Sequence, residues 1–249
     1  MSQLTIFDLF KIVSWDESKI YNRMVQIICL ANSWKNRDRC IAGINELQGK
    51  WVRPVSDLPD GRIPKAMCLI NTLEPALLDV LEIPLAKTGP DFGFACENLS
   101  VLPGEWRQVG KVPPAYLLKY CNSQEYILHN DLESVPVEYM QSLPMCDRLT
   151  LQLVKAVRFT VNEPIKRKEG GNKWKGSIVT QDGQRLTSTI TDPVFILKLE
   201  LGYRPQKACL VTVSLGMPWR RDNWEGGYRC WKLIAGVVEL PEDVVDDEI

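Results

Sequence analysis

The strongest pattern of apolar and polar positions lies in residues 27–56, IICLANSWKNRDRCIAGINELQGKWVRPVS. Three apolar runs predict β-strands, at residues 27–31, 40–44 and 51–55. Polar stretches at residues 32–38 and 48–49 separate these runs and predict turns. Strands joined by turns this short pair with their neighbours in sequence, so we expect an antiparallel meander.

The rest of the first half predicts one more strand and two short helices. Residues 77–85, LLDVLEIPL, are apolar enough for a strand. Proline and glycine interrupt residues 88–149, and within them residues 114–121 and 137–143 predict short helices, the first with a proline at its start. Residues 1–23 form a separate leader, in which an apolar segment precedes a polar hinge.

Residues 150–240 return to strand patterns. The segment LTLQLVKAVRFTV, residues 149–161, alternates well enough to predict one long, curved strand. Asp182-Gly183 predicts the turn of a hairpin within residues 173–192. Three more strands are expected from VFILKLELGY, ACLVTVSLG and RCWKLIAGVVEL. Such a set suits a small closed or partly open barrel, and the acidic residues 241–249 predict a solvated tail.

Composition is that of an ordinary globular protein. Of the 249 residues, 45% are hydrophobic and 24% are charged, and the net charge is −1. This sum neither indicates nor excludes nucleic-acid binding, because local patches attract ligands. No apolar run is long enough to span a bilayer and the N-terminus lacks a signal-peptide pattern, so we expect a cytoplasmic protein.

The residue patterns of common catalytic and metal sites are missing. The eight cysteines include no C-x-x-C pair, so we expect small buried side chains instead of zinc ligands or disulfides. The single histidine, His129, has no G-x-S-x-G to match it, and we interpret it as an incidental surface residue. The chain has neither a P-loop nor a G-x-G-x-x-G after a strand. We therefore expect no catalytic residue, cofactor or metal, with an enzyme of dispersed carboxylates as a third alternative.

The segments IICLANS, RCIAG and GKWVRPVS together resemble a family of bacterial dual-OB-domain proteins. The similarity extends to LLDVLEIPL and to SLGMPW and RCWKLIAGVVEL, and so covers roughly residues 24–240. The resemblance implies two OB-fold barrels and a role in nucleic-acid binding or sensing, in the setting of bacterial conflict systems. It implies no established reaction.

A short internal echo accompanies this resemblance. IAGINEL at residues 41–47 matches IAGVVEL at residues 234–240 at Ile, Ala, Gly, Glu and Leu. Two related barrels would explain the echo, and a chance match is the alternative. The sequence thus predicts a mostly β fold with two small OB-like antiparallel barrels and a short helical connector. The first OB-like domain, with its helical insertion, is expected at residues 24–149 and the second at residues 150–240.

Cations beside aromatic residues mark three candidate nucleic-acid-binding surfaces, because cations pair with phosphates and aromatic rings stack on bases. The first lies on the polar turn and the third strand and comprises Trp34, Lys35, Arg37, Arg39 and Arg53. The second is a glycine-containing loop with Lys166, Arg167, Lys168, Lys173, Trp174 and Lys175. The third lies between the last two strands and comprises Trp219, Arg220, Arg221 and Trp224.

Each surface has a structural alternative. On the first, Trp51 is expected in the barrel core and Arg53 can equally cap a loop carbonyl. The second can be a solvated charged loop. The third suits a protein partner as well as a nucleic acid, because Trp, Tyr and Arg dominate protein hot spots.

The leader contains Gln3, Leu4, Ile6 and Phe7, in a QLTIF segment that resembles the short Q-L-x-L-F peptide with which bacterial proteins dock onto the replicative sliding clamp. An amphipathic segment that docks on the body of the protein is the alternative. We interpret the whole chain as a non-catalytic accessory or sensor protein that binds single-stranded nucleic acid, DNA or RNA. A protein-interaction module of a bacterial defence or replication-linked system is the alternative function.

Overall fold

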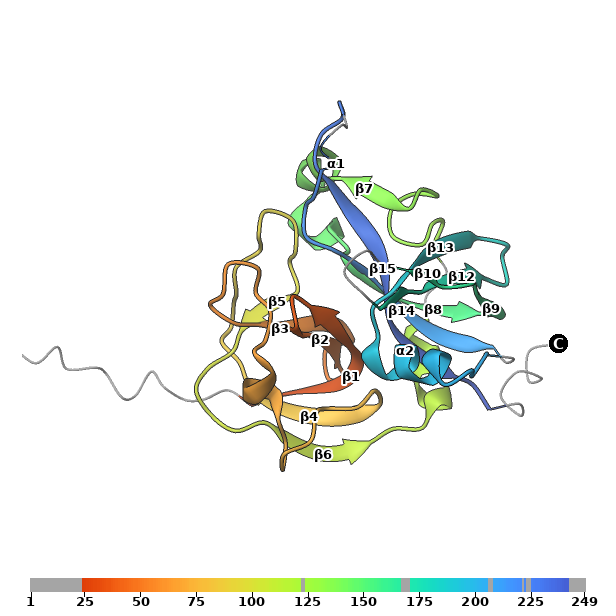
Figure 1. Ribbon diagram of the computed structural model, residues 1–249. Coiled ribbons are helices and arrows are strands. Elements are labelled where there is room, and N and C mark those ends of the chain that lie inside the picture. The colour runs from red at the N-terminus through yellow and green to blue at the C-terminus, as the bar shows by residue number, and fades with distance from the viewer. Residues whose placement is uncertain are drawn as a thin grey trace, which may run out of the picture.

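The protein is mostly β, as predicted, in a computed structural model that describes residues 24–121, 124–166, 171–205, 208–220, 222 and 225–241 (Figure 1). The strands of the first sheet are β1 (Met24–Lys35), β2 (Asp38–Asn45), β3 (Lys50–Val55), β4 (Asp79–Pro84), β5 (Asn98–Ser100) and β6 (Arg107–Lys111). The strands of the second sheet are β7 (Ser134–Pro136), β8 (Leu151–Ala156), β9 (Arg158–Val161), β12 (Lys175–Val179), β13 (Arg185–Ile190), β14 (Cys209–Leu215) and β15 (Arg229–Glu239). A separate pair is formed by β10 (Ile165–Lys166) and β11 (Asn172–Lys173). The helices are α1 (Val137–Ser142), α2 (Pro193–Glu200) and the 3-10 helices Lys65–Cys68, Pro114–Tyr120 and Met145–Asp147.

The first sheet has the strand order β5-β3-β2-β1-β4-β6. The predicted meander is confirmed, because β2 pairs antiparallel with both β1 and β3. The outer strand β5 instead pairs in parallel with β3. The sheet is therefore mixed, and its pairing runs as an open path instead of closing into an antiparallel barrel.

The β1–β2 hairpin is longer than its apolar runs predict. Residues 32–35, expected in the turn, continue β1, and the turn itself consists of Asn36 and Arg37 with φ of 50° and 70°. Positive φ at both central positions is typical of a tight two-residue hairpin turn. Asn32 and Ser33 are buried, and the Asn32 side chain donates a hydrogen bond to the Pro75 carbonyl at 2.8 Å. The strand can therefore carry Asn32 inside the protein, because its side-chain N–H group has a hydrogen-bond acceptor there.

The second sheet has the order β8-β14-β15-β13-β12-β9. The short strand β7 pairs with the first three residues of β15, Arg229–Trp231. The hairpin predicted at Asp182-Gly183 is confirmed as β12 and β13. The strand predicted over residues 149–161 is instead two strands that break at Val157 and lie at opposite ends of the sheet. The connector predictions are confirmed as the 3-10 helix Pro114–Tyr120 and as α1.

The prediction of a strand for VFILKLELGY is wrong, because residues 194–200 of this segment belong to α2. Asp192 caps this helix by accepting hydrogen bonds from the backbone N–H groups of Val194 and Phe195 at 3.0 Å each. Pro193 occupies the first turn, where it suits the helix. Neither α2 nor any other helix in the described part of the chain is long and apolar enough to cross a membrane.

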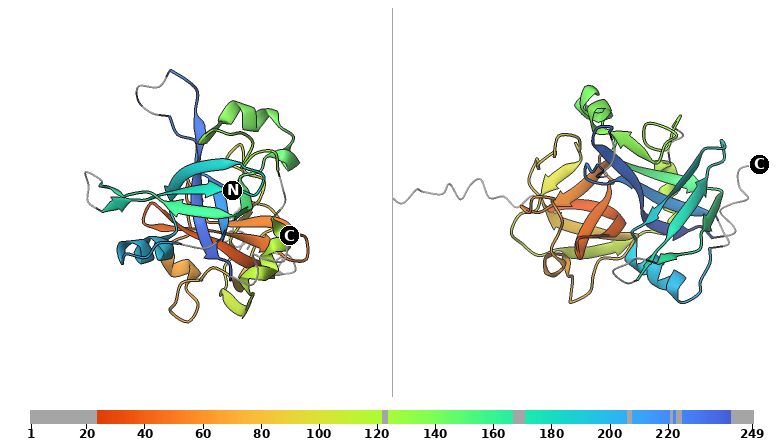
Figure 2. Two further views of the ribbon diagram at one scale, coloured as in Figure 1. Left: turned by 90° about the vertical axis from the view of Figure 1, so that its right-hand side faces the viewer. Right: turned by 45° about the horizontal axis from the view of Figure 1, so that its top comes forward.

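The two sheets pack directly on each other through β1 (Figure 2). Ile27 points into the core of the first sheet. Ile28 and Leu30 point the other way and pack against Leu153 and Leu210 of the second sheet. Alternate side chains of a strand face opposite sides, so β1 is apolar on both faces because each face has its own core. The arrangement fixes the position of one sheet relative to the other.

The two glycines of the internal echo both lie against the backbone of β1. A Cβ atom on Gly43 would lie 2.2 Å from the Ile28 carbonyl oxygen, and one on Gly236 would lie 2.3 Å from the Leu30 carbonyl oxygen. Neither position has room for a side chain. The echo therefore marks the strands β2 and β15, which approach β1 from the two sheets.

Candidate functional site

The end of the β1–β2 hairpin presents an aromatic ring to solvent. Trp34 is 49% exposed, although it lies in a strand. The Arg39 guanidinium stacks on its ring at 4.2 Å from the centroid. The Trp34 backbone N–H donates to the Thr191 carbonyl of the second sheet at 2.9 Å. The ring is thus held in a fixed place at the junction of the two sheets.

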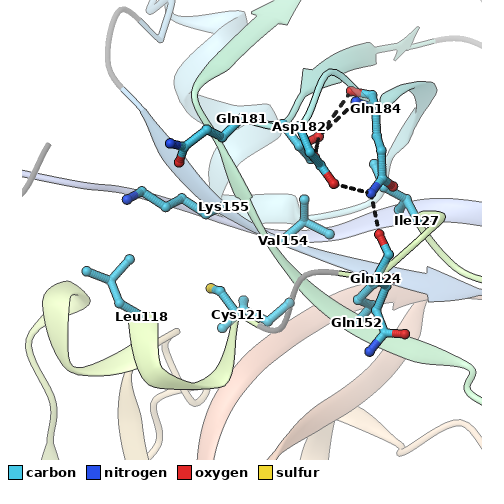
Figure 3. Close-up of a pocket in the computed structure, with 12 residues that line it drawn as sticks. Leu118, Cys121, Gln124, Ile127, Gln152, Val154, Lys155, Gln181, Asp182 and Gln184 are labelled. Carbon is cyan, nitrogen blue, oxygen red and sulfur yellow. Dashed lines mark hydrogen bonds between the residues drawn. The ribbon is translucent and has the colours of Figure 1, made fainter. Parts of the chain in front are cut away.

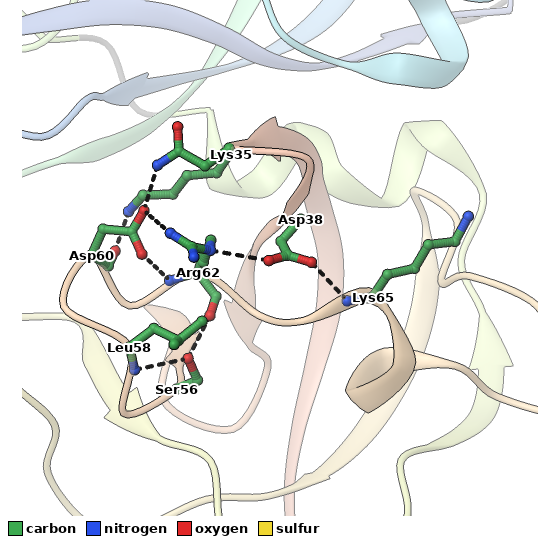
Figure 4. A network of polar contacts seen from close by, with 8 residues as sticks. Lys35, Asp38, Ser56, Leu58, Asp60, Arg62 and Lys65 are labelled. Atoms are coloured by element: carbon green, nitrogen blue, oxygen red, sulfur yellow. Dashed lines mark hydrogen bonds and ion pairs between the residues drawn. The ribbon is translucent and has the colours of Figure 1, made fainter.

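A polar network fixes the cations around this hairpin end (Figure 4). The Lys35 ammonium donates to the Asp60 backbone carbonyl, and Asn36 donates to the Asp60 carboxylate at 2.8 Å. Arg62 joins Asp38 and Asp60 through ion pairs of 3.0 and 3.1 Å. Burial lowers the pKa of the Lys35 ammonium. Partial burial opposes ionisation of Asp60, but hydrogen bonds from Arg62 and Asn36 outweigh it and lower the pKa of this carboxyl.

A cleft of about 360 Å³ opens beside Trp34, between the two sheets. We call it the inter-sheet cleft. One wall comes from β1, β2 and β3, and the other from β14, β15 and the segment that follows β14. Its lining residues are Ser33, Trp34, Lys35, Asn36, Cys40, Arg53, Asp60, Phe94, Thr191, Ser214, Leu215, Gly216, Met217, Leu233 and Ala235.

Two further tryptophans extend from the second wall. Trp231 and Leu233 of β15 lie on the face opposite the buried Cys230 and Lys232. Trp219 is 53% exposed, and its ring lies 6.2 Å from that of Trp231. The Gly216 N–H donates a hydrogen bond to the Trp231 carbonyl at 2.8 Å, so β15 at Trp231 lies beside the segment that lines the cleft. One exposed aromatic ring, Trp34, therefore lines the cleft, and another, Trp219, lies beyond its opposite wall.

Arg53 forms the bottom of the cleft and holds the two sheets together. Its Nη1 pairs with the Glu97 carboxylate at 3.0 Å, and its Nη2 donates to Thr150 at 3.1 Å and to Ser214 at 3.3 Å. The Arg53 and Glu97 side chains are only 9% and 6% exposed. This corrects the prediction that Arg53 contacts a phosphate, because its guanidinium is buried and already paired with Glu97.

The comparison with protein families agrees with this two-sheet architecture. The model of the dual OB-containing domain family matches residues 25–237. The chain belongs to this family. Domains of the OB type bind oligonucleotides and oligosaccharides across a sheet face and its flanking loops, and in the dual OB-containing domain described here two sheets share the inter-sheet cleft.

The other comparisons add nothing to the family assignment. A search of curated proteins found no match. Among solved structures, the crystal structure of the tetrameric p202 HIN2 is similar, with 9% identity over 88% of this chain and 92% of that chain. The TM-score is 0.26, which is too low to carry an argument about fold or function.

Arg39 and Trp174 also occupy structural positions in this dual OB-containing domain. Arg39 is 4% exposed and its Nε pairs with Glu74 at 2.5 Å, so it supports the Trp34 ring and does not reach solvent. Trp174 is 3% exposed, and its indole N–H donates to Glu200 of α2 at 2.6 Å. The predictions that Arg39 and Trp174 contact a ligand directly are therefore corrected, because both side chains are buried and bonded to residues distant in sequence.

The remaining predicted residues are spread over the surface. Lys35 and Lys173 are half-buried, Arg37, Lys166 and Arg220 are exposed, and Lys175 lies 3.8 Å from Glu133. Arg220 lies over the Tyr228 ring at 5.6 Å. None of the described residues of the second surface, Lys166, Lys173, Trp174 and Lys175, lines the inter-sheet cleft. Outside the described residues lie Gln3, Leu4, Ile6, Phe7, Arg167, Lys168, Arg221 and Trp224.

Sequence reasoning missed the apolar wall of the cleft and one buried cation. Phe94, Met217 and Leu233 come from distant segments, and no local pattern joins them. Lys232 is 2% exposed, and its ammonium donates to the Asn130 carbonyl at 2.5 Å. Burial lowers the pKa of Lys232 to about 8. The alternation of β15 was the available signal, since it places Lys232 on the core side of the strand.

The groups with catalytic or metal-binding chemistry are dispersed over the described part of the chain. No group of three metal-ligating side chains comes together there. His129 is half-buried, with its Nε2 2.6 Å from the Leu149 carbonyl, and burial lowers its pKa. Burial also raises the pKa of the Cys29 and Cys209 thiols, which keeps both protonated at neutral pH.

Proposed function

We propose that the protein binds single-stranded nucleic acid along the inter-sheet cleft and acts as an accessory or sensor without catalysing a reaction. The observation that carries the proposal is the exposed Trp34, which lines a cleft between OB-type sheets, together with the exposed Trp219, whose ring packs on Trp231 beyond the opposite wall. In this proposal the first OB-like unit, residues 24–149, and the second, residues 150–240, each supply one rim.

The chemistry of the rims suits a single strand better than a duplex. Unpaired bases expose both faces to aromatic rings, and each base stacked on an aromatic contributes roughly 1–3 kcal/mol. Arg37 beside Trp34 and Arg220 beside Trp219 are exposed cations that can pair with phosphates. A base-stacking ring next to a phosphate-pairing cation is the arrangement that binds a strand with little sequence preference.

Equilibrium binding of fluorescently labelled single-stranded DNA and RNA tests the proposal. We expect Trp34→Ala and Trp219→Ala each to weaken binding by about 5- to 150-fold, which corresponds to the loss of one stacked base. Tyr139→Ala is the matched control, because Tyr139 is an exposed aromatic (43%) that packs on His129 away from the cleft lining. The proposal fails if no oligonucleotide binds the wild-type protein at low salt, or if both tryptophan variants bind as tightly as the control.

A further inference from the structure

We propose that the inter-sheet cleft is a pocket for one unstacked nucleobase of the bound strand, while the phosphates stay on its rim. This inference rests on the proposed function and names the part of the ligand that the cleft takes. The volume of about 360 Å³ lies at the small end of the range for ligand pockets. Such a space suits one base with its sugar and excludes a longer folded segment.

The two walls of the cleft match the two kinds of surface on a nucleobase. Met217 and Leu233, which are only partly buried, supply apolar contact area, which suits the flat face of a base. Asn36 and Asp60 contribute an amide and a carboxylate on the opposite wall, which suit the polar edge of a base. Proteins that bind single strands take up splayed-out bases between such surfaces.

The charges in the cleft separate the base from its phosphate. The Arg53 guanidinium at the bottom is already paired with Glu97, so it offers no free charge to a phosphate. The Asp60 carboxylate pairs with Arg62 at 3.1 Å, and its backbone carbonyl accepts a hydrogen bond from the Lys35 ammonium, so these charged groups are also engaged within the protein. The exposed cation at this end of the hairpin is Arg37 on the turn. Phosphates are therefore expected on the rim and the neutral base inside.

The cleft is also formed before any ligand arrives. The Arg53 hydrogen bonds to Thr150 and Ser214 fix the bottom, and the bond from Trp34 to Thr191 fixes the mouth. A preformed pocket loses little conformational entropy when it binds a ligand. One base position is therefore expected to contribute more to affinity than its neighbours.

Gly216 offers a way to fill the cleft without disturbing the fold. It lines the cleft, and a Cβ atom there would meet Leu233 at 3.4 Å and the Trp231 carbonyl at 3.5 Å, both ordinary contacts. Gly216→Leu adds a side chain beside Leu233 in the space proposed for the base. Gly216→Ala adds only the methyl group and so fills less of the same space, whereas Tyr139→Ala lies away from the cleft lining and is the control.

The experiment moves a single abasic site along the shortest oligonucleotide that binds the wild-type protein at full affinity. We expect one position to lose about tenfold or more in affinity and the others to lose less. In Gly216→Leu the affinity of the intact oligonucleotide falls to that of the abasic one and the positional difference disappears. Gly216→Ala has a smaller effect on both, and Tyr139→Ala, away from the cleft lining, behaves as wild type. Thermal unfolding checks that the variants fold. If Gly216→Leu does not fold, Met217→Ala replaces it, because this substitution removes part of the apolar wall of the cleft.

The outcomes separate this inference from the proposed function. Equal losses at every abasic position, or a filled cleft that leaves affinity and positional pattern unchanged, overturn the base pocket while the strand-binding function stands. The absence of oligonucleotide binding to the wild-type protein overturns both.

Discussion

Replacing Arg53 by methionine is expected to destabilise the fold severely, because it leaves a buried carboxylate without its cation. Arg53 contacts Glu97 at 3.0 Å, Thr150 at 3.1 Å and Ser214 at 3.3 Å. The Glu97 side chain is only 6% exposed, so water cannot replace the lost guanidinium. Removing one partner of a buried ion pair costs about 3–5 kcal/mol of unfolding free energy, a large part of the stability of an ordinary domain.

Urea unfolding followed by circular dichroism measures this loss. Arg62→Met is the matched control, because Arg62 also pairs with two carboxylates but is 29% exposed, so water can solvate the carboxylates and a much smaller loss is expected. The double variant Arg53→Met, Glu97→Met is expected to regain much of the stability, since no buried charge remains unpaired. A cost of Arg53→Met below about 1 kcal/mol, or equal to that of Arg62→Met, would refute the role of Arg53 in joining the sheets.

Two other perturbations test the packing of the sheets. Gly236→Ala places a methyl group 2.3 Å from the Leu30 carbonyl oxygen, so we expect a loss of roughly 1–3 kcal/mol or more in thermal unfolding, whereas Gly216→Ala is expected to be neutral. Burial lowers the pKa of Lys232 from 10.5 to about 8 in the folded protein. Between about pH 8 and pH 10.5 the unfolded chain therefore binds more protons than the folded protein, and the free energy of unfolding rises with pH. Relative to Lys232→Met, the wild-type protein should gain about 2 kcal/mol of unfolding free energy between about pH 7 and pH 9.5, and parallel pH profiles would contradict the burial of this ammonium.

The fold could be predicted from sequence where the pattern is local. The meander of β1, β2 and β3 follows from apolar runs and short turns, and the Asp182-Gly183 hairpin follows from its turn residues. The error at α2 arose because VFILKLEL is apolar enough for a strand, although Asp192-Pro193 is a helix start. The break at Val157 has no comparable signal, because the residues on both sides of it favour strands.

The candidate site was less predictable, because partners distant in sequence decide whether a cation or an aromatic residue is buried. Of the residues on the candidate surfaces, Trp34 is exposed, whereas Arg53 and Trp174 are buried beside Glu97 and Glu200. The cleft itself depends on how the second sheet packs against β1. No property of the segment around Met217 predicts that it faces the first sheet.

The most direct test of the account is the salt dependence of single-strand binding. Log affinity for a labelled single-stranded oligonucleotide is expected to fall linearly with log salt concentration, with a slope of about −0.7 for each phosphate contacted. Arg37→Ala should make this slope shallower by about 0.7, because Arg37 is the exposed cation of the hairpin turn. Steep, linear salt dependence that Arg37→Ala reduces is the predicted result. Absence of binding at about 50 mM salt, or an affinity that does not change with salt, would contradict the proposal that this cleft binds nucleic acid.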